Sequence, residues 1–331
     1  MKAIVLISGG LDSSLAVKLI QNQGIEVLAL HFLLPFLKYD REDINESTVR
    51  KIVQETGCRL QVVELKDEYL NMLEKPNHGY GKNFNPCIDC KILMLKYAKK
   101  TMVETGAKFI VSGEVLGQRP MSQNKSSLRK IELESNLEGL LLRPLSALLL
   151  PETVPEKRKW VNRKELLNIK GRSRRMQIRL ARKFNIKTYS WPDGGCFLTD
   201  PHFSRRLKDM VEHKEYYFDN IGLLKVGRHF RVNPSFKLVV GRNEKENKKM
   251  VRFLRKGDLY LEPLTLPGPT AIGRGVFDKN SIALSGRIVA RYTAKDKKIE
   301  IKVKRFFGAK AKTEVIGLEA IDDAELKRLR I

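Results

Sequence analysis

The fold of this chain is decided by the stretch KAIVLISGGLDSSLAVKLIQN, residues 2–22. After Lys2, residues 3–7 are apolar and rich in β-branched side chains, which is typical of a buried strand. Ser8-Gly9-Gly10 ends that run with small residues suited to a tight turn. Apolar side chains then return at helical spacing, at Leu15, Ala16, Leu19 and Ile20. The stretch therefore predicts a strand, a glycine turn and a helix.

The turn has the composition of an anion-binding loop. Backbone N–H groups of small residues can close around a phosphate at a helix N-terminus, and serine hydroxyls add donors. Asp12 is unusual there, because a carboxylate repels phosphate unless Mg²⁺ lies between them. An ordinary helix cap on Asp12 or Ser13 is the alternative. The residues expected to hold the phosphates are Ser8, Gly9, Gly10, Asp12, Ser13 and Ser14.

Strand-like and helical patterns alternate through the first 150 residues. Strand-like runs lie at 27–32, 60–65 and 108–112, and helical periodicity lies around residues 49–53 and across 88–104. Repeated βα units of this kind predict an α/β fold, a doubly wound parallel sheet covered by helices. Ligands of such sheets bind beyond the carboxyl ends of the strands.

The composition changes after residue 150 and again near residue 216. Residues 151–155 form a proline-marked break, and the segment 151–215 reads as a basic helical extension that completes the catalytic domain. Residues 216–331 read as a smaller β-rich domain. Its expected strands lie at 236–240, 258–264, 282–292 and 299–306.

The chain is strongly basic. Its formal net charge is +25, from 63 Lys and Arg against 38 Asp and Glu, which would attract a polyanion such as nucleic acid. A thermophile-type charged surface is the alternative, but such a surface would be closer to charge balance. No run of about 18 apolar residues and no signal-peptide pattern occurs, so we expect a cytoplasmic protein without a membrane segment.

The basic residues concentrate in one expected helix. Arg175, Arg179 and Arg182 follow one another at i, i+4 and i+7 on one face, while Met176, Leu180 and Phe184 share another. Like charges at this spacing repel one another, and an RNA backbone would relieve the repulsion. A solvated charged face is the alternative. The expected RNA contacts of this segment are Arg172, Arg174, Arg175, Arg179, Arg182 and Lys183.

Three of the four cysteines have informative surroundings. Cys87 and Cys90 form a C-x-x-C pair at the start of the expected helix 88–104, where the helix dipole lowers thiol pKa values. Cys196 follows Gly194-Gly195, and Cys58 reads as a small core residue. Three thiolates can hold a [4Fe–4S] cluster with one iron open, or Zn²⁺ with His202 as a fourth ligand, or relay sulfur as a persulfide without metal.

The loop and its neighbours resemble a known superfamily. SGGLDSS, residues 8–14, resembles the PP-loop of the ATP pyrophosphatases, an adenine nucleotide α-hydrolase-like fold whose members transfer AMP to a substrate oxygen. Gly113-Glu114-Val115-Leu116-Gly117-Gln118 with Ser122-Gln123, and then Leu142-Arg143-Pro144-Leu145, resemble segments of tRNA 4-thiouridine synthases in the same order. The resemblance covers roughly the first 150 residues.

Two further resemblances concern the cysteines and the C-terminal part. CIDC, residues 87–90, is similar to the motif of iron–sulfur-dependent thiouridine synthases, and NPCIDC and GGCFL also look like segments of tRNA 2-thiouridylases. Val240-Gly241-Arg242-Asn243, with Glu246-Asn247, resembles the small RNA-binding domain of fibronectin-binding-like ribosome quality control proteins. That resemblance implies an RNA contact at Arg242, and an ordinary turn-linked sheet is the alternative.

These resemblances imply an ATP-dependent tRNA sulfurtransferase that adenylates a uridine carbonyl and replaces its oxygen with sulfur, with 4-thiouridine the favoured product. Asp12, Cys87, Cys90 and Cys196 would be catalytic, and the three cysteines would be the metal ligands. By analogy, His31, Phe32, Gly113 and Gln118 would line the nucleotide pocket. The partners implied are tRNA and a sulfur donor, either sulfide or the persulfide of a cysteine desulfurase.

The sequence begins at the PP-loop strand and contains neither the N-terminal RNA-binding region nor the rhodanese-like domain of some 4-thiouridine synthases. We therefore expect a different mode of tRNA docking, by the C-terminal domain or by a separate protein. The alternatives are 2-thiouridine synthesis, another adenylating PP-loop enzyme with a structural zinc site, and an inactive RNA-binding module. Intact Asp12 and Ser13 argue against the last.

Overall fold

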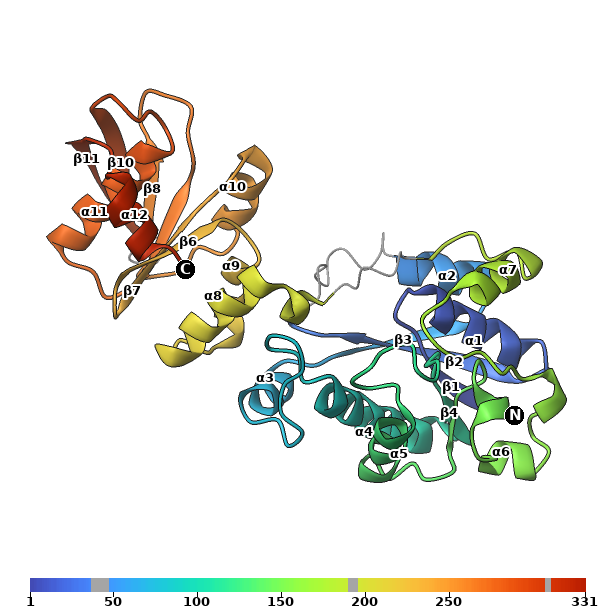
Figure 1. Ribbon diagram of the computed structural model, residues 1–331. Helices are drawn as coiled ribbons and strands as arrows, with labels where there is room; N and C mark the ends of the chain where they lie inside the picture. Colours follow the sequence, from blue (N-terminus) through green and yellow to red (C-terminus); the bar gives the residue numbers. More distant parts are fainter. Residues whose placement is uncertain (37–47, 190–195, 307–310) are drawn as a thin grey trace. The chain divides into compact units, whose positions relative to one another are not determined.

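The computed structural model describes residues 1–36, 48–189, 196–306 and 311–331 (Figure 1). The chain divides into two compact units, Met1–Thr199 and Asp200–Ile331. The finer division predicted at residues 150 and 215 stays a prediction. Gly194 and Gly195, which precede the third cysteine of the predicted site, lie outside the described residues.

The first unit is built on a parallel five-stranded sheet with the order β3-β2-β1-β4-β5. The strand order reverses between β1 and β4, so the loops that follow these two strands meet at the switch point where doubly wound sheets bind ligands. The predicted α/β fold is confirmed. The strands are β1 (Lys2–Leu6), β2 (Glu26–Leu33), β3 (Arg59–Glu64), β4 (Phe109–Val111) and β5 (Leu141–Leu142).

Helices cover both faces of this sheet, which explains why the central strands β1 and β4 are mostly apolar and buried. Figure 1 shows α1, α2 and α7 on one face and α4 and α5 on the other. Their core includes Ala3, Val5 and Ala16, all without exposed surface. The helices are α1 (Leu11–Gln21), α2 (Thr48–Thr56), α3 (Asp67–Glu74), α4 (Cys87–Thr105), α5 (Lys125–Glu134), α6 (Val154–Lys157) and α7 (Arg175–Lys183).

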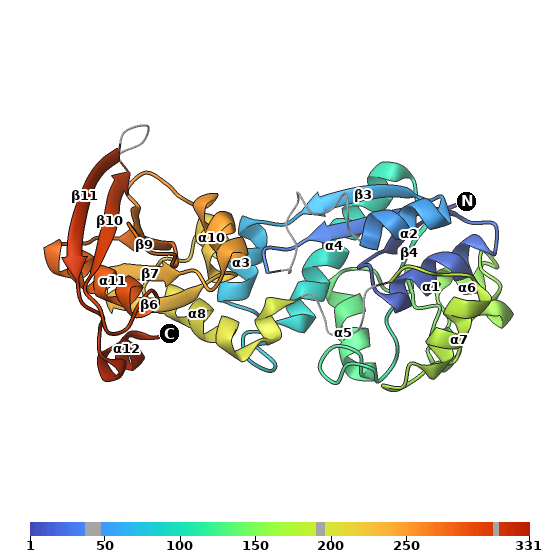
Figure 2. The ribbon, with the colours of Figure 1, turned by 90° about the horizontal axis from the view of Figure 1, so that it is seen from above.

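The second unit is a six-stranded antiparallel sheet with the order β11-β10-β8-β9-β7-β6, preceded by two helices. Helix α11 lies across one face of that sheet (Figure 2). The predicted β-rich domain is confirmed. Its strands are β6 (Arg228–Asn233), β7 (Phe236–Val240), β8 (Leu259–Pro263), β9 (Ala271–Gly275), β10 (Ile299–Phe306) and β11 (Ala311–Leu318). Its helices are α8 (Pro201–Glu212), α9 (Phe218–Leu224), α10 (Glu244–Val251), α11 (Lys279–Arg291) and α12 (Asp323–Leu329).

One predicted strand is wrong. Residues 282–292 lie in and just beyond α11, not in a strand. Asp278 caps this helix, because its side chain accepts a hydrogen bond from the N–H of Ser281 at 2.7 Å. The buried positions Ile282, Ser285 and Val289 recur every three or four residues, so the β-branched residues there serve a helix face.

No helix among the described residues is both long enough and apolar enough to cross a membrane.

Candidate active site

The glycine turn between β1 and α1 leaves the helix N-terminus open. Gly9 has φ 80°, a left-handed conformation that favours glycine. Gly10 is the N-cap residue of α1, and no side chain caps that end. The hydroxyl of Ser13 donates to the Gly10 carbonyl at 2.8 Å, and the hydroxyl of Ser14 does so at 3.1 Å. The alternative of a cap on Asp12 or Ser13 is therefore wrong, and the first-turn N–H groups have no side-chain acceptor among the described residues.

Asp12 lies in the first turn of α1 with one carboxylate oxygen in use. Its Oδ2 accepts a hydrogen bond from Nε2 of Gln118 at 3.0 Å, while its buried Oδ1 has no partner among the described residues. Burial raises the pKa of Asp12, and the hydrogen bond from Gln118 and the nearby Arg174 and Arg119 oppose that rise. A buried carboxylate with a free oxygen beside a helix N-terminus is the type of oxygen ligand that Mg²⁺ requires.

Gly113 follows β4 and allows the PP-loop helix to come close. A Cβ at this position would lie 2.6 Å from the carbonyl carbon of Asp12 and 2.7 Å from the backbone nitrogen of Ser13. Backbone atoms cannot move aside as a flexible side chain can. Gly113 therefore sets the contact between the β4 loop and the first turn of α1, and any other residue would displace the loop that carries Asp12.

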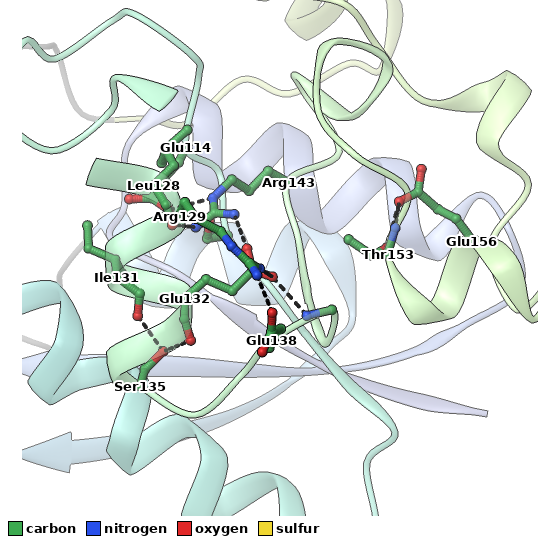
Figure 3. A network of polar contacts seen from close by, with 12 residues as sticks. Glu114, Leu128, Arg129, Ile131, Glu132, Ser135, Glu138, Arg143, Thr153 and Glu156 are labelled. Atoms are coloured by element: carbon green, nitrogen blue, oxygen red, sulfur yellow. Dashed lines mark hydrogen bonds and ion pairs between the residues drawn. The ribbon is translucent and has the colours of Figure 1, made fainter. Parts of the chain in front are cut away.

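Glu114 forms the buried centre of a charge network. Arg143 donates from Nε to Oε2 of Glu114 at 3.1 Å, and from Nη1 to Glu132 at 3.1 Å (Figure 3). Lys91, on α4, lies 3.4 Å from the other oxygen of Glu114. Burial alone would raise the pKa of Glu114, but Lys91, Arg143 and the hydroxyl of Ser112 outweigh burial and lower the pKa to about 2. The network ties the helix that begins with Cys87 to the β4 loop.

The third cysteine is held beside the C-x-x-C pair by two hydrogen bonds to backbone carbonyls. The N–H of Phe197 donates to the carbonyl of Phe36 at 2.9 Å, just past the end of β2. On the other side, Nδ2 of Asn83 donates to the carbonyl of Thr199 at 2.8 Å. These contacts hold the segment that carries Cys196 against two parts of the chain that are far away in sequence. Cys196 thus lies near Cys87 and Cys90 because of tertiary packing.

The thiols are close enough for their charges to interact. Burial raises the pKa of Cys90 to about 12, with further increases from Cys196 and Cys87. Burial also raises the pKa of Cys196 to about 11, and Cys87 adds to that shift. The prediction that the helix dipole lowers thiol pKa values is wrong for Cys90, because the cost of burying a thiolate exceeds the effect of the dipole.

Tyr69, on α3, is a site residue that the sequence analysis missed. Its side chain is 1% exposed, its hydroxyl is beside the sulfur of Cys90, and the charges of all three cysteines act on it. The ring packs 6.0 Å from the ring of Phe36, measured between centroids. No local sequence signal marks Tyr69, because α3 is an ordinary amphipathic helix.

Three thiols form a donor set that is suited to soft metals. Among the described residues, no group of three or more His, Cys, Asp and Glu side chains is arranged to hold one metal ion. The predicted cluster, zinc site and sulfur relay all stay predictions. Cys58 is buried in the apolar core, as predicted.

His31 and Phe32 are buried near the carboxyl end of β2, with 2% and 6% of their surface exposed. Nδ1 of His31 lies 2.7 Å from the carbonyl of Ile7 and donates to it, and burial lowers the pKa of this imidazole, which keeps the ring neutral. His31 thus supports the strand that enters the PP-loop. The predicted contact of both residues with a nucleotide stays a prediction.

Helix α7 packs against α1, with its basic side chains outward. Arg175, Arg179 and Arg182 are exposed, while Ala181 is buried in an apolar cluster with Leu11 and others. Met176, predicted to share the buried face, is instead 46% exposed, because the inner face of α7 is centred on Gln177 and Ala181.

Arg242, a predicted RNA contact, forms an ion pair with Glu246 in the structure. Nε of Arg242 lies 2.9 Å from a carboxylate oxygen of Glu246, and the side chain of Asn243 caps α10 by accepting from the N–H of Glu246 at 3.0 Å. A Cβ on Gly241 would lie 2.0 Å from the side-chain oxygen of Asn247. The resembling motif therefore has a structural role here, in fixing α10 to the sheet. RNA binding by Arg242 stays a prediction.

Family models match both parts of the chain. Residues 1–152 match the family described as thiamine biosynthesis protein (ThiI), and residues 227–330 match the family described as NFACT protein RNA binding domain. The two parts of the chain thus resemble a ThiI-type PP-loop domain and an NFACT-type domain. The resemblances drawn from the motifs near residues 8–14, 113–118 and 240–247 are confirmed.

Individual proteins resemble the first unit. The protein of Thermococcus kodakarensis named probable tRNA sulfurtransferase is 32% identical over 152 residues, which cover 44% of this chain and 37% of that protein. The Helicobacter hepaticus protein named tRNA-specific 2-thiouridylase MnmA is 29% identical over 117 residues, covering 34% of each chain. A solved 4-thiouridine synthetase–RNA complex with bound ATP shares 20% identity with a TM-score of 0.39, over 68% of this chain and 52% of that one. The chain spans well under half the length of these curated relatives.

Proposed function

We propose that this protein is an ATP-dependent tRNA sulfurtransferase that adenylates a uridine carbonyl oxygen and then replaces it with sulfur. The observation that carries the proposal is the combination of an open PP-loop containing Asp12 with three cysteines brought together from distant parts of the chain. An adenylating enzyme needs only the first of these features. A thiolating enzyme needs both.

The PP-loop supplies the activation step. The uncapped N–H groups of α1 and the hydroxyls of Ser13 and Ser14 would bind the phosphates of ATP. Asp12, through its free Oδ1, would hold Mg²⁺, which neutralises charge on the departing pyrophosphate. The uridine oxygen attacks the α-phosphorus, pyrophosphate leaves, and the oxygen becomes part of AMP, a far better leaving group. Arg174 and Arg119, near Asp12, add positive charge there.

The cysteines supply the substitution step. A sulfur nucleophile attacks the activated carbon and AMP leaves with the original oxygen. Cys87, Cys90 and Cys196 would hold a [4Fe–4S] cluster, which when bound offers one iron without a protein ligand for sulfide. In the alternative, one cysteine carries a persulfide and a second attacks it, forming a disulfide as the sulfur is released. Tyr69 donates to Cys90 and orients it in either case.

RNA would be held by positive charge. The exposed arginines of α7 lie on the helix that packs against α1, and the net charge of +25 favours a polyanion. Relatives of the first unit bear names that include tRNA sulfurtransferase and tRNA-specific 2-thiouridylase, which supports tRNA as substrate. We favour 4-thiouridine as product, with 2-thiouridine as the second candidate because relatives of both kinds match the PP-loop domain.

The test is a thiolation assay with nucleoside analysis. The protein, purified without oxygen, is incubated with unmodified tRNA, ATP, Mg²⁺ and sulfide, and the digested tRNA is examined by mass spectrometry. We expect one thiolated uridine in the wild type, and loss of at least about a hundredfold in rate in Asp12→Asn and in Cys90→Ala. The matched control is Cys58→Ala, a buried cysteine outside the site, which should retain the rate.

The outcomes separate the candidates. Retention time of the product distinguishes 4-thiouridine from 2-thiouridine. Iron and acid-labile sulfide that are lost in Cys87→Ala, Cys90→Ala and Cys196→Ala alike would establish the cluster, whereas activity without iron would establish the relay. Pyrophosphate release without any thiolated nucleoside would overturn sulfur transfer and leave another adenylation.

A further inference from the structure

Gln177 is a buried polar residue whose amide atoms have no hydrogen-bond partner of good geometry among the described residues. It lies on the inner face of α7 with no exposed surface. Among the residues that the structure describes, neither its Oε1 nor its Nε2 has a hydrogen-bond partner. A buried amide left unpaired is costly, and most buried polar groups in folded proteins are paired. Such a group is expected where a ligand completes the hydrogen bonds.

Packing alone does not explain a glutamine at this position. One helical turn further along the same face, Ala181 contributes to an apolar cluster with Leu11 and Leu15 of α1. A leucine of similar volume would extend that cluster without any unpaired group. The polar side chain therefore has a cost in the folded protein that the apolar cluster does not offset.

The amide faces a second unpaired group. The amide of Gln177 lies close enough to the carboxylate of Asp12 to lower its pKa, but no hydrogen bond of good geometry joins the two side chains. The Oδ1 of Asp12 is also buried without a partner within the described part of the chain. The other oxygen of Asp12 is already paired with Gln118 at 3.0 Å. Two unpaired buried groups thus adjoin each other at the open end of α1, where a polyphosphate would bind.

We propose that Gln177 is a nucleotide-binding residue of this site, and that its ligand is a nucleoside triphosphate with a divalent cation. A carboxamide can do two things there at once. Its N–H would donate to a phosphate oxygen, and its oxygen would accept from water on a cation held by Asp12. The inference rests on the proposed function, because it assumes that the PP-loop takes a nucleotide.

A leucine variant separates a ligand-binding role from a structural one. In Gln177→Leu we expect affinity for a non-hydrolysable ATP analogue with Mg²⁺ to fall about tenfold, because at least one hydrogen bond to a charged group is lost. The nucleotide-free variant should nevertheless unfold at a higher temperature than wild type, because two unpaired buried atoms are removed. Calorimetric titration and thermal unfolding of the full chain measure the two effects.

The matched control is Gln21→Leu, the same substitution on α1. The Nε2 of Gln21 donates to the carbonyl of Thr56 at 2.9 Å, so this amide has a structural use. Gln21→Leu should lower the unfolding temperature and leave nucleotide affinity unchanged. Gln177→Glu is a second probe, since it keeps the shape but replaces the donor by a negative charge beside Asp12 and should weaken binding further.

Wild-type affinity in Gln177→Leu, or a lower unfolding temperature with unchanged affinity, would show that the amide is structural and would overturn the inference. If the wild type binds no nucleotide, the proposed function fails together with the inference. If the wild type binds nucleotide and Gln177→Leu binds it with the same affinity, the inference alone fails.

Discussion

At the scale of single residues, the motif residues Glu114 and Arg143 are structural. Both belong to segments that resemble tRNA 4-thiouridine synthases, and a motif near an active site invites a catalytic interpretation. Their side chains are 3% and 4% exposed and pair with each other, which leaves neither available to a substrate. They hold the β4 loop and α4 in place. Glu114 is therefore a positioning residue for both halves of the site.

The lowered pKa of Glu114 predicts an acid-sensitive fold. Its pKa is about 2 in the folded protein against an ordinary 4.5, so the carboxylate stabilises the folded state fully above about pH 4.5. That contribution is lost progressively as the pH falls from about 4.5 to about 2, because protonation then removes the ion pairs. Urea unfolding at a series of pH values should show this loss in the wild type and a smaller one in Glu114→Gln.

A variant that lacks Arg143, the partner of Glu114, is the control for this acid sensitivity. In Arg143→Met the carboxylate of Glu114 keeps only Lys91 as a cationic partner, so its pKa should rise and the acid loss should begin at a higher pH. A buried charge without its partner should also cost about 3 kcal/mol at neutral pH. The lowered pKa of Glu114 would be contradicted if the wild type lost no more stability between pH 4.5 and 2 than Glu114→Gln does.

At the scale of elements, α7 has two faces with different roles. Its inner face packs on α1, and its outer face presents Arg175, Arg179 and Arg182. The double variant Arg179→Ala with Arg182→Ala should weaken tRNA binding and reduce the slope of log affinity against log salt by about one per lost phosphate contact. Fluorescence titrations of tRNA at several salt concentrations measure that slope.

Charge at another surface provides the comparison for α7. Lys100, on α4, is 73% exposed and pairs with Glu104 at 3.9 Å. Lys100→Ala removes a positive charge from the chain but not from α7, and should leave the slope unchanged. Equal effects of both variants would mean that tRNA responds to net charge alone, and that the outer face of α7 is an ordinary solvated surface.

At the scale of the whole molecule, two units with separate cores should unfold separately. The core of Met1–Thr199 includes Val5 and Ile20, and the core of Asp200–Ile331 includes Phe236 and Val303. Scanning calorimetry should resolve two transitions. A nucleotide with Mg²⁺ should raise the temperature of one alone, because a ligand stabilises only the unit that binds it.

Val303→Ala identifies the other transition. This valine has no exposed surface, and its truncation should cost about 2 kcal/mol in the second unit only. A single transition that responds to both nucleotide and Val303→Ala would show that the two units unfold as one.

The sequence by itself determined the features that are encoded locally. The run from residue 2 to residue 22 specifies strand, glycine turn and helix through the spacing of its apolar and small residues, and the repetition of that pattern specifies the parallel sheet. Net charge and the C-x-x-C pair are likewise properties of the chain that need no fold. Local patterns gave the wrong prediction where a helix and a strand can have the same composition. In residues 282–292, β-branched residues predicted a strand but belong to α11.

Only the tertiary structure decided which distant residues meet and what burial does to them. It placed Tyr69 among the cysteines and raised the pKa of Cys90 although that thiol lies at a helix N-terminus. Within the described residues, it also left the amide of Gln177 beside Asp12 without a well-formed hydrogen bond. The physical reason is that desolvation and pairing depend on which surfaces pack together. Packing between segments as far apart as β2, α4 and residues 196–199 is not contained in the spacing of any one of them.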